Sequence, residues 1–217
     1  MVAGIPALHT VVKVCGLTRL DDARAALEAG ADWLGFVVRG DSPRRIEPAL
    51  AADIIAGLPG ATAVAVMVAP EPGEALAVAR RIGATRVQLH RVDPVRWPQD
   101  FPLPLAFAVP VALDGRIAGP LPPPHALLLL DAAHDTMAGG TGRAFPWEAA
   151  VPLAAIRPVM LAGGLGADNV AAAIERVRPF GVDVSSRLEI SPGLKDHELV
   201  RHFVIAVRAY DAQRGAA

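Results

Sequence analysis

The chain has 217 residues, of which 53% are hydrophobic and 20% are charged, and its formal net charge is -1. This length fits one large domain, and the apolar fraction predicts a large buried core. A net charge so close to zero gives no basic surface for nucleic acid or for an anionic membrane, so neither is an expected partner.

Residues 1–10 lack the basic and apolar regions of a signal peptide. No apolar run approaches the roughly 18 residues needed to span a bilayer. One cysteine in the whole chain is compatible with a reducing compartment. We therefore expect a cytoplasmic protein.

Eight short apolar runs separated by turn residues predict eight strands. The runs are nearly continuous in Val, Leu, Ala and Met rather than alternating, as expected for strands buried on both faces. The predicted strands are Val11–Cys15, Trp33–Val38, Ala63–Val68, Arg86–His90, Leu103–Ala112, Ala126–Asp131, Pro158–Ala162 and Val182–Ser185.

Helical patterns separate most of these strands. The predicted helices are Leu20–Ala29, Pro48–Gly57, Glu71–Ile82, Asp168–Val177 and Asp196–Tyr210. Two connections are weaker: residues 91–99 allow a short helix at most, and residues 115–124, with four prolines, predict an irregular loop.

A strand-then-helix repeat that reaches eight strands predicts an α/β protein, a single-domain (β/α)₈ TIM barrel over residues 1–217. The alternative is a doubly wound open sheet. That fold usually has five or six strands and a glycine-rich dinucleotide loop after the first strand, whereas here Gly16-Leu17-Thr18 follows it.

Cys15 lies at the end of the first predicted strand, just before Gly16. As the only cysteine, it cannot form an intramolecular disulfide. A lone cysteine is often a small buried hydrophobe. In a parallel barrel, however, the carboxyl end of a strand is where active sites form, so a reactive thiol is the other interpretation.

Two adjacent loops carry the pattern of a phosphate site. Gly163-Gly164 follows the seventh strand and lets backbone N–H groups approach an anion, and Ser185-Ser186 ends the eighth and adds hydroxyl donors. Loops seven and eight of a barrel commonly bind phosphate. Two ordinary turns are the simpler alternative.

Asp131 closes an apolar run at the end of the sixth strand. Burial there would raise the pKa of its carboxyl group and suit it to act as an acid near neutral pH. A helix cap or a salt bridge with Arg143 is the structural alternative. The nearby glycine-rich run 139–143 is not a P-loop, and it predicts either a segment that lines the substrate or a bare connection.

These features form part of an ordered set of motifs that runs along nearly the whole chain. The motifs are Lys13-Val14-Cys15-Gly16-Leu17-Thr18, Ser42-Pro43-Arg44, Val87-Gln88-Leu89-His90, Leu129-Leu130-Asp131, Gly139-Gly140-Thr141-Gly142, Leu161-Ala162-Gly163-Gly164-Leu165 with Asn169-Val170, and Asp183-Val184-Ser185-Ser186 with Pro192-Gly193-Leu194-Lys195-Asp196. Together they resemble the phosphoribosylanthranilate isomerase family of tryptophan biosynthesis.

The resemblance implies an isomerase of the ketose–aldose class, which acts on a phosphosugar without a cofactor or metal. It would carry out the Amadori rearrangement of N-(5′-phosphoribosyl)anthranilate to 1-(2-carboxyphenylamino)-1-deoxyribulose 5-phosphate. By the same resemblance, Asp131 is the general acid and Cys15 the general base. Arg44 would bind the anthranilate carboxylate, and Gly163, Gly164, Ser185 and Ser186 would form the phosphate site. Members of such families occur as monomers or homodimers, and both stay open here.

Three further expectations concern the surroundings of these residues. Alternation along the first strand places Lys13 on the inward side with Cys15, and Asp183 has the same parity on the neighbouring eighth strand, so we predict a Lys13–Asp183 ion pair. We expect the site to lower the thiol pKa of Cys15. Arg187 and Arg91 stand where the family usually has glycine, which leaves the phosphate contacts open.

Two other functions compete with this interpretation. The related sugar isomerase of histidine biosynthesis resembles a barrel with a carboxylate at the end of strand one and a second phosphate loop, and neither feature is present here. A phosphosugar-binding barrel without catalytic activity would keep the phosphate loops alone, and intact Cys15 and Asp131 argue against it.

Overall fold

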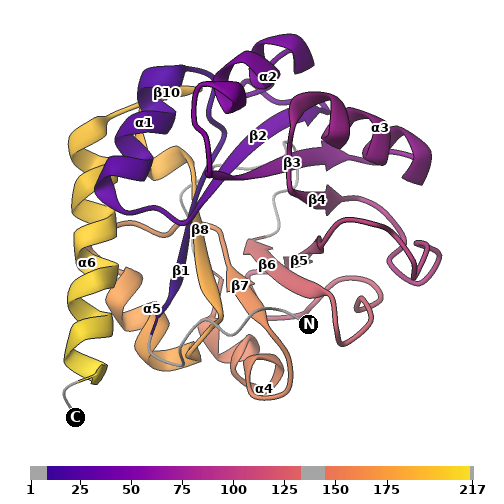
Figure 1. The fold of residues 1–217 in the computed structure, drawn as a ribbon. Helices are drawn as coiled ribbons and strands as arrows, with labels where there is room; N and C mark the ends of the chain where they lie inside the picture. The colour runs from indigo at the N-terminus through magenta and orange to yellow at the C-terminus, as the bar shows by residue number, and fades with distance from the viewer. Residues whose placement is uncertain (1–8, 133–144, 216–217) are drawn as a thin grey trace.

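A computed structural model describes residues 9–132 and 145–215, and in it eight parallel strands close into a barrel in sequence order (Figure 1). β8 pairs with β1, so the single-barrel prediction is confirmed and the open-sheet alternative is wrong. The strands are β1 (Val11–Cys15), β2 (Trp33–Arg39), β3 (Thr62–Val68), β4 (Arg86–His90), β5 (Leu105–Val111), β6 (Leu127–Ala132), β7 (Val159–Leu161) and β8 (Gly181–Val184).

Helices cover the outside of the barrel except after β4 and β5, where the described connections contain none, as the sequence predicts. The helices are α1 (Leu20–Ala29), α2 (Pro48–Ala56), α3 (Pro72–Ile82), α4 (Val151–Ala154), α5 (Val170–Val177) and α6 (His197–Gly215), with short 3₁₀ turns η1 (Trp147–Ala149) and η2 (Ser186–Leu188). α5 begins two residues later than predicted and α6 ends five residues later. Within the described ranges, no helix has the length and apolar character needed to cross a membrane.

Local sequence explains where α3 begins and ends. Pro72 occupies its first turn, and Glu71 and Glu74 form a reciprocal capping box with the backbone. Gly83 ends the helix in the left-handed conformation, with φ of 74°. These signals place the start of β4 only three residues after the cap.

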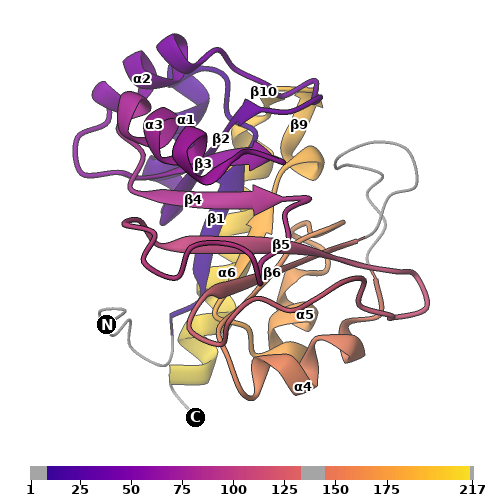
Figure 2. The ribbon, with the colours of Figure 1, turned by 90° about the vertical axis from the view of Figure 1, so that its right-hand side faces the viewer.

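A small antiparallel hairpin was missed by the sequence prediction. It consists of β9 (Glu189–Ser191) and β10 (Leu194–Lys195), joined through Pro192-Gly193. Figure 2 shows the hairpin at the side of the molecule toward which the arrow of β4 points. It therefore lies at the carboxyl end of the barrel, where catalytic residues of such barrels are found.

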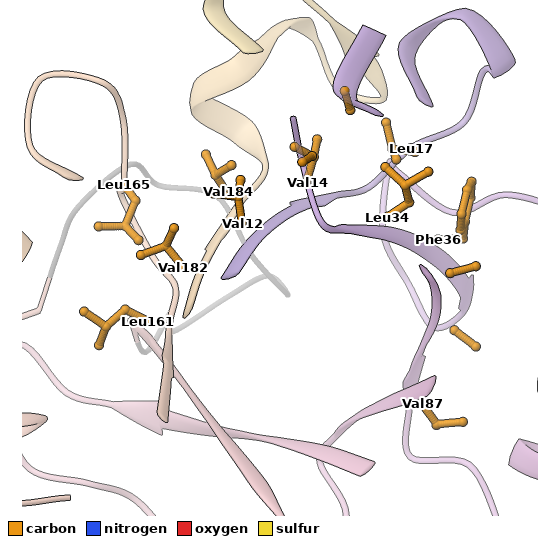
Figure 3. Close-up of a cluster of buried hydrophobic side chains, with 14 of the residues drawn as sticks. Val12, Val14, Leu17, Leu34, Phe36, Val87, Leu161, Leu165, Val182 and Val184 are labelled. Atoms are coloured by element: carbon orange, nitrogen blue, oxygen red, sulfur yellow. The ribbon is translucent and has the colours of Figure 1, made fainter. Parts of the chain in front are cut away.

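The apolar side chains form two layers separated by the sheet. Alternate residues of each strand, such as Val12 and Val14 of β1 and Val182 and Val184 of β8, point outward to the helices (Figure 3). A smaller cluster, which includes Val11, Trp33, Val64, Leu129 and Met160, fills the interior of the barrel. The inward positions of β1 and β8 above this cluster are therefore free to carry polar groups.

Candidate active site

A cavity of about 250 Å³ opens at the carboxyl end of the barrel. Each of the eight strands, or the loop directly after it, contributes to its lining. All the site residues predicted from the sequence line it: Cys15, Arg44, Asp131, Gly163, Gly164, Ser185 and Ser186. The fold thus brings together residues that are up to 171 positions apart in the sequence.

The predicted ion pair between Lys13 and Asp183 is confirmed. The two residues are register partners on β1 and β8, and Lys13 Nζ donates to both carboxylate oxygens at 2.9 Å. Their side chains are 1% and 8% exposed. A buried charge is tolerated only with a partner, so the pair is tightly constrained in this position.

Cys15 lies beside this pair. A Cβ built on Gly35, the β2 register partner of Cys15, would lie 2.8 Å from Cys15 Sγ and 3.1 Å from Lys13 Cε. The missing side chain of Gly35 therefore provides the space for the thiol. The expectation of a lowered pKa is wrong: burial raises the pKa of the Cys15 thiol, although the Lys13 charge opposes this effect.

Asp131 has the perturbed pKa that the sequence predicts. Burial, and then repulsion from Asp183, raise the pKa of its carboxyl group to about 7. Gly163 is needed beside it, because a Cβ at this position would lie 2.9 Å from Asp131 Oδ1 and 2.7 Å from the backbone nitrogen of Ala132. Gly163 also has φ of 80°, which favours glycine.

The loops after β7 and β8 present unused backbone donors to the cavity. Asn169 folds the first loop: its Nδ2 donates to the Gly164 carbonyl at 3.0 Å, and its Oδ1 accepts from the Gly166 N–H at 2.8 Å. Among the described residues, no oxygen accepts from the backbone N–H of Gly164 or of Ser186. Free N–H groups in two adjacent loops are typical of an anion site.

Arg44 lies 8% exposed on the loop after β2. Gly16, with φ of 74°, turns the chain after Cys15 so closely against Arg44 that a Cβ there would lie 2.6 Å from Arg44 Cδ. The Arg44 guanidinium pairs with Glu189 of β9. Neither Glu189 nor its second partner, Lys195, is a site residue in the sequence prediction, because the hairpin that carries them is not predicted.

The sequence prediction assigns no role to two cavity residues of β4, Gln88 and His90. Gln88 is buried, and its Nε2 lies 2.9 Å from His90 Nε2. Burial, and then the charges of Lys13 and Arg91, lower the pKa of His90 to about 4. His90 is therefore neutral near pH 7, and its Nε2 can accept the Gln88 amide hydrogen.

Arg91 and Arg187, which the sequence analysis singled out, differ in backbone conformation. Arg91 has a positive φ of 54°, the left-handed conformation that glycine adopts most easily. Arg187 does not have a positive φ, so its backbone carries no such strain. Its Nη1 donates to the Gly164 carbonyl at 3.2 Å, and its Nη2 pairs with Asp168.

The glycine-rich run 139–143, including Arg143, lies outside the described residues. Its suggested contact with the substrate or with Asp131 therefore stays a prediction. Across residues 9–132 and 145–215, no three His, Cys, Asp or Glu side chains lie close enough together to hold a metal ion.

Comparison with known proteins gives one consistent result. The family model for N-(5′-phosphoribosyl)anthranilate (PRA) isomerase matches residues 12–206. The isomerase of that name from Rubrobacter xylanophilus is 43% identical over 91% of this chain and 98% of its own length.

Two solved isomerase structures are also similar. One is a complex with reduced 1-(o-carboxyphenylamino)-1-deoxyribulose 5-phosphate, with a TM-score of 0.79 and 33% identity over 93% of this chain and 100% of the other. The other is of monomers generated from the dimeric enzyme of Thermotoga maritima, with the same TM-score, identity and coverage.

Proposed function

The chain belongs to the N-(5′-phosphoribosyl)anthranilate isomerase family, and we propose that Asp131 and Cys15 are its general acid and general base. The activity is the conversion of N-(5′-phosphoribosyl)anthranilate to 1-(2-carboxyphenylamino)-1-deoxyribulose 5-phosphate in tryptophan biosynthesis. The observation that carries the assignment of roles is the pKa of about 7 at Asp131, in the same cavity as the Cys15 thiol.

Asp131 supplies the proton that opens the sugar ring. Its proton passes to the ring oxygen, the C1–O bond breaks, and the nitrogen lone pair forms a protonated Schiff base with C1. A group with a pKa near the working pH is the most effective acid, because a large fraction of it is protonated and it is still acidic enough to transfer the proton. A carboxyl group with an ordinary pKa near 3.9 would be almost fully ionised at pH 7.

Cys15 then removes the proton from C2. The positive nitrogen draws electrons from C1, which makes the neighbouring C2–H acidic, so the C–H electron pair moves to form the enolamine. Return of a proton to C1 and loss of the hydroxyl proton give the ketone product, an isomer of the substrate. The thiolate is the active form, and the neighbouring Lys13 ammonium stabilises it against the effect of burial.

The two anionic ends of the substrate fit two groups of residues that line the cavity. The phosphate would accept hydrogen bonds from the free N–H groups of Gly164 and Ser186, with the Ser185 hydroxyl and the bare backbone of Gly163 beside them. The anthranilate carboxylate would pair with Arg44, whose planar fork suits a carboxylate. Binding at both ends holds C1 and C2 between the acid and the base.

The test of these roles is a fluorescence assay with N-(5′-phosphoribosyl)anthranilate. Wild-type protein should remove the substrate fluorescence, and Cys15→Ser and Asp131→Asn should each lower kcat by a factor of about 100 or more, as is typical when an acid or base is lost. The exposed Asp53→Asn serves as the matched control and should keep full activity.

Two results would contradict the proposal. Wild type that binds the substrate without turnover would favour a phosphosugar-binding barrel. An Asp131→Asn or Cys15→Ser variant with nearly normal kcat would show that another group performs that proton transfer. The same preparations would report the oligomeric state by sedimentation, for which family members include dimers and for which we expect a monomer or a homodimer.

A further inference from the structure

Three charged side chains form a compact cluster at the edge of the cavity: Arg44, Glu189 of β9 and Lys195 of β10. Arg44 Nε donates to Glu189 Oε1 and Oε2 at 2.9 and 3.0 Å, and Arg44 Nη2 donates to Oε2 at 2.7 Å. Lys195 Nζ donates to Glu189 Oε1 at 2.8 Å. The side chains of Arg44, Glu189 and Lys195 are only 10%, 4% and 0% exposed.

The carboxylate of Glu189 is close to saturated as an acceptor. Besides Arg44 and Lys195, it accepts from the backbone N–H of Gly193 at 3.3 Å. A carboxylate has about four lone-pair positions, so little capacity for a further donor is left. Lys195 and Gly193 belong to the same hairpin as Glu189, so their contacts fix the orientation of the Glu189 carboxylate.

The pairing leaves one edge of the Arg44 guanidinium unused. A guanidinium can bind a carboxylate through its Nε and Nη2 edge or through its Nη1 and Nη2 edge. Glu189 occupies the first edge. No hydrogen bond from Nη1 to any described residue is present, and Arg44 lines the cavity. The second edge is thus available for a second carboxylate.

The charge of the cluster also fits an anionic ligand. Two cations share one carboxylate, so the nearly buried cluster carries one net positive charge. Burial lowers the pKa of Lys195, although Glu189 opposes this effect, which shows that an uncompensated charge is costly here. An arriving carboxylate on the free edge of Arg44 would neutralise the excess.

We propose that Glu189 is a positioning residue for substrate binding: it holds the Nε and Nη2 edge of Arg44, so that the opposite edge receives the anthranilate carboxylate. This rests on the proposed role of Arg44. Lys195 extends the support, because its Nζ also donates to the Ser185 carbonyl at 3.2 Å, and the Ser185 hydroxyl donates to the Cys15 carbonyl at 3.0 Å. The hairpin thus links the carboxylate site to the phosphate loop and to the strand that carries the base.

The central test is the variant Glu189→Gln, which keeps the shape of the side chain but removes its charge and one acceptor. We expect KM for N-(5′-phosphoribosyl)anthranilate to rise about tenfold, with kcat within about twofold, because the contact is equally present in the ground state and the transition state. Inhibition by ribose 5-phosphate, which has no anthranilate carboxylate, should keep its inhibition constant. A loss of packing alone would weaken both ligands and lower kcat.

A double-mutant cycle with Arg44→Met tests whether Glu189 acts through Arg44. In the Arg44→Met background, Glu189→Gln should cause no further rise in KM. Glu74→Gln, which breaks an exposed pair with Arg39, is the matched control and should leave KM unchanged. If Glu189→Gln folds poorly, Glu189→Asp is the second variant. It keeps the charge, but its side chain is one methylene shorter, so the carboxylate no longer reaches Arg44 in the same way. It should also raise KM while leaving kcat and the ribose 5-phosphate inhibition constant unchanged.

Three outcomes would overturn the proposal. A lower KM in Glu189→Gln would mean that Glu189 competes with the substrate carboxylate for Arg44. An equal rise in KM with and without Arg44 would mean that it acts elsewhere, and an equal weakening of ribose 5-phosphate inhibition would mean a general structural role. If Arg44 does not bind the anthranilate carboxylate, the result is distinguishable from these three, because Arg44→Met by itself would then leave KM unchanged.

Discussion

The two ends of this barrel differ in how burial shifts the pKa values of their acidic groups. At the amino end, Asp211 of α6 accepts from the Thr10 N–H at 2.9 Å and from the Thr10 hydroxyl at 2.7 Å, which ties the last helix to the start of β1. Asp32 accepts from the Val12 N–H and from Arg208. Burial alone would raise the pKa of Asp32, but these hydrogen bonds, together with one from His9, hold it below its usual value.

At the carboxyl end, the carboxyl and thiol groups are buried with less compensation. The pKa of Asp131 is raised to about 7, and that of Cys15 is also raised, with burial as the first cause for both. Both groups are easier to protonate than they would be in water. Asp211 and Asp32 at the amino end accept hydrogen bonds that stabilise the fold, whereas Asp131 and Cys15 at the carboxyl end are held in a state that costs stability and suits proton transfer.

The largest expected effect is at the amino end. Asp211→Ala removes both acceptors of the buried Thr10 N–H and hydroxyl, so we expect the free energy of unfolding to fall by about 3 kcal/mol in urea denaturation. kcat and KM at a temperature where the protein stays folded should change less than twofold. The control Asp53→Ala, at an exposed position, should change stability by less than about 0.5 kcal/mol. A large loss of kcat in Asp211→Ala would show that the two ends are not separable.

A smaller effect, with the opposite sign, is expected for Asp131→Asn. The folded pKa of Asp131 lies above the unfolded value, so the folded chain retains a proton that the unfolded chain releases. This group's contribution to stability is present below pH 4 and is lost as pH rises to about 7. Relative to wild type, Asp131→Asn should therefore gain about 2–3 kcal/mol in stability between pH 5 and pH 8.

Urea unfolding of wild type and Asp131→Asn at both pH values checks this prediction, with Asp53→Asn as the matched control. A stability difference that does not change with pH would mean that the carboxyl group titrates normally in the folded protein. The difference between the two ends of the barrel would then lie only in their hydrogen-bond partners and not in the pKa of Asp131.

The smallest effect is expected at Arg187, which lines the cavity beside Gly164. Its guanidinium lies beside the phosphate loop but already pairs with Asp168, and its side chain is 35% exposed. Exposed ion pairs contribute about 0.2–1 kcal/mol, so Arg187→Ala should raise KM and the inhibition constant of inorganic phosphate by about twofold to fivefold. The exposed Arg96→Ala, which does not line the cavity, is the control. Unchanged values in Arg187→Ala would assign the residue no role at the phosphate end.

The sequence predicts the strands well because strands of a parallel barrel are apolar on both faces. The same regularity predicts the Lys13–Asp183 pair, since parity along a strand and adjacency of β1 and β8 suffice. All the predicted site residues lie around one cavity for the same reason: the ends of parallel strands meet at one face.

The rest depends on effects that a linear pattern does not contain. β9 and β10 are three and two residues long, too short for a periodic signal, so the contact of Glu189 with Arg44 is not predicted. The thiol pKa of Cys15 depends on a balance between burial and the Lys13 charge, and only the three-dimensional arrangement shows that burial is the larger. The left-handed backbone at Arg91 is also a property of the folded loop.

The Lys13–Asp183 pair has a consequence for how the chain closes into a ring. It joins residues 170 positions apart, across the seam between the first and last strands. A slip of one residue at this seam would turn one of the two charged side chains to the outer face, among valines that pack against the helices, and would leave its partner unpaired inside the barrel. The Lys13–Asp183 ion pair therefore also selects the register in which the barrel closes, because a wrong register would separate two buried charges.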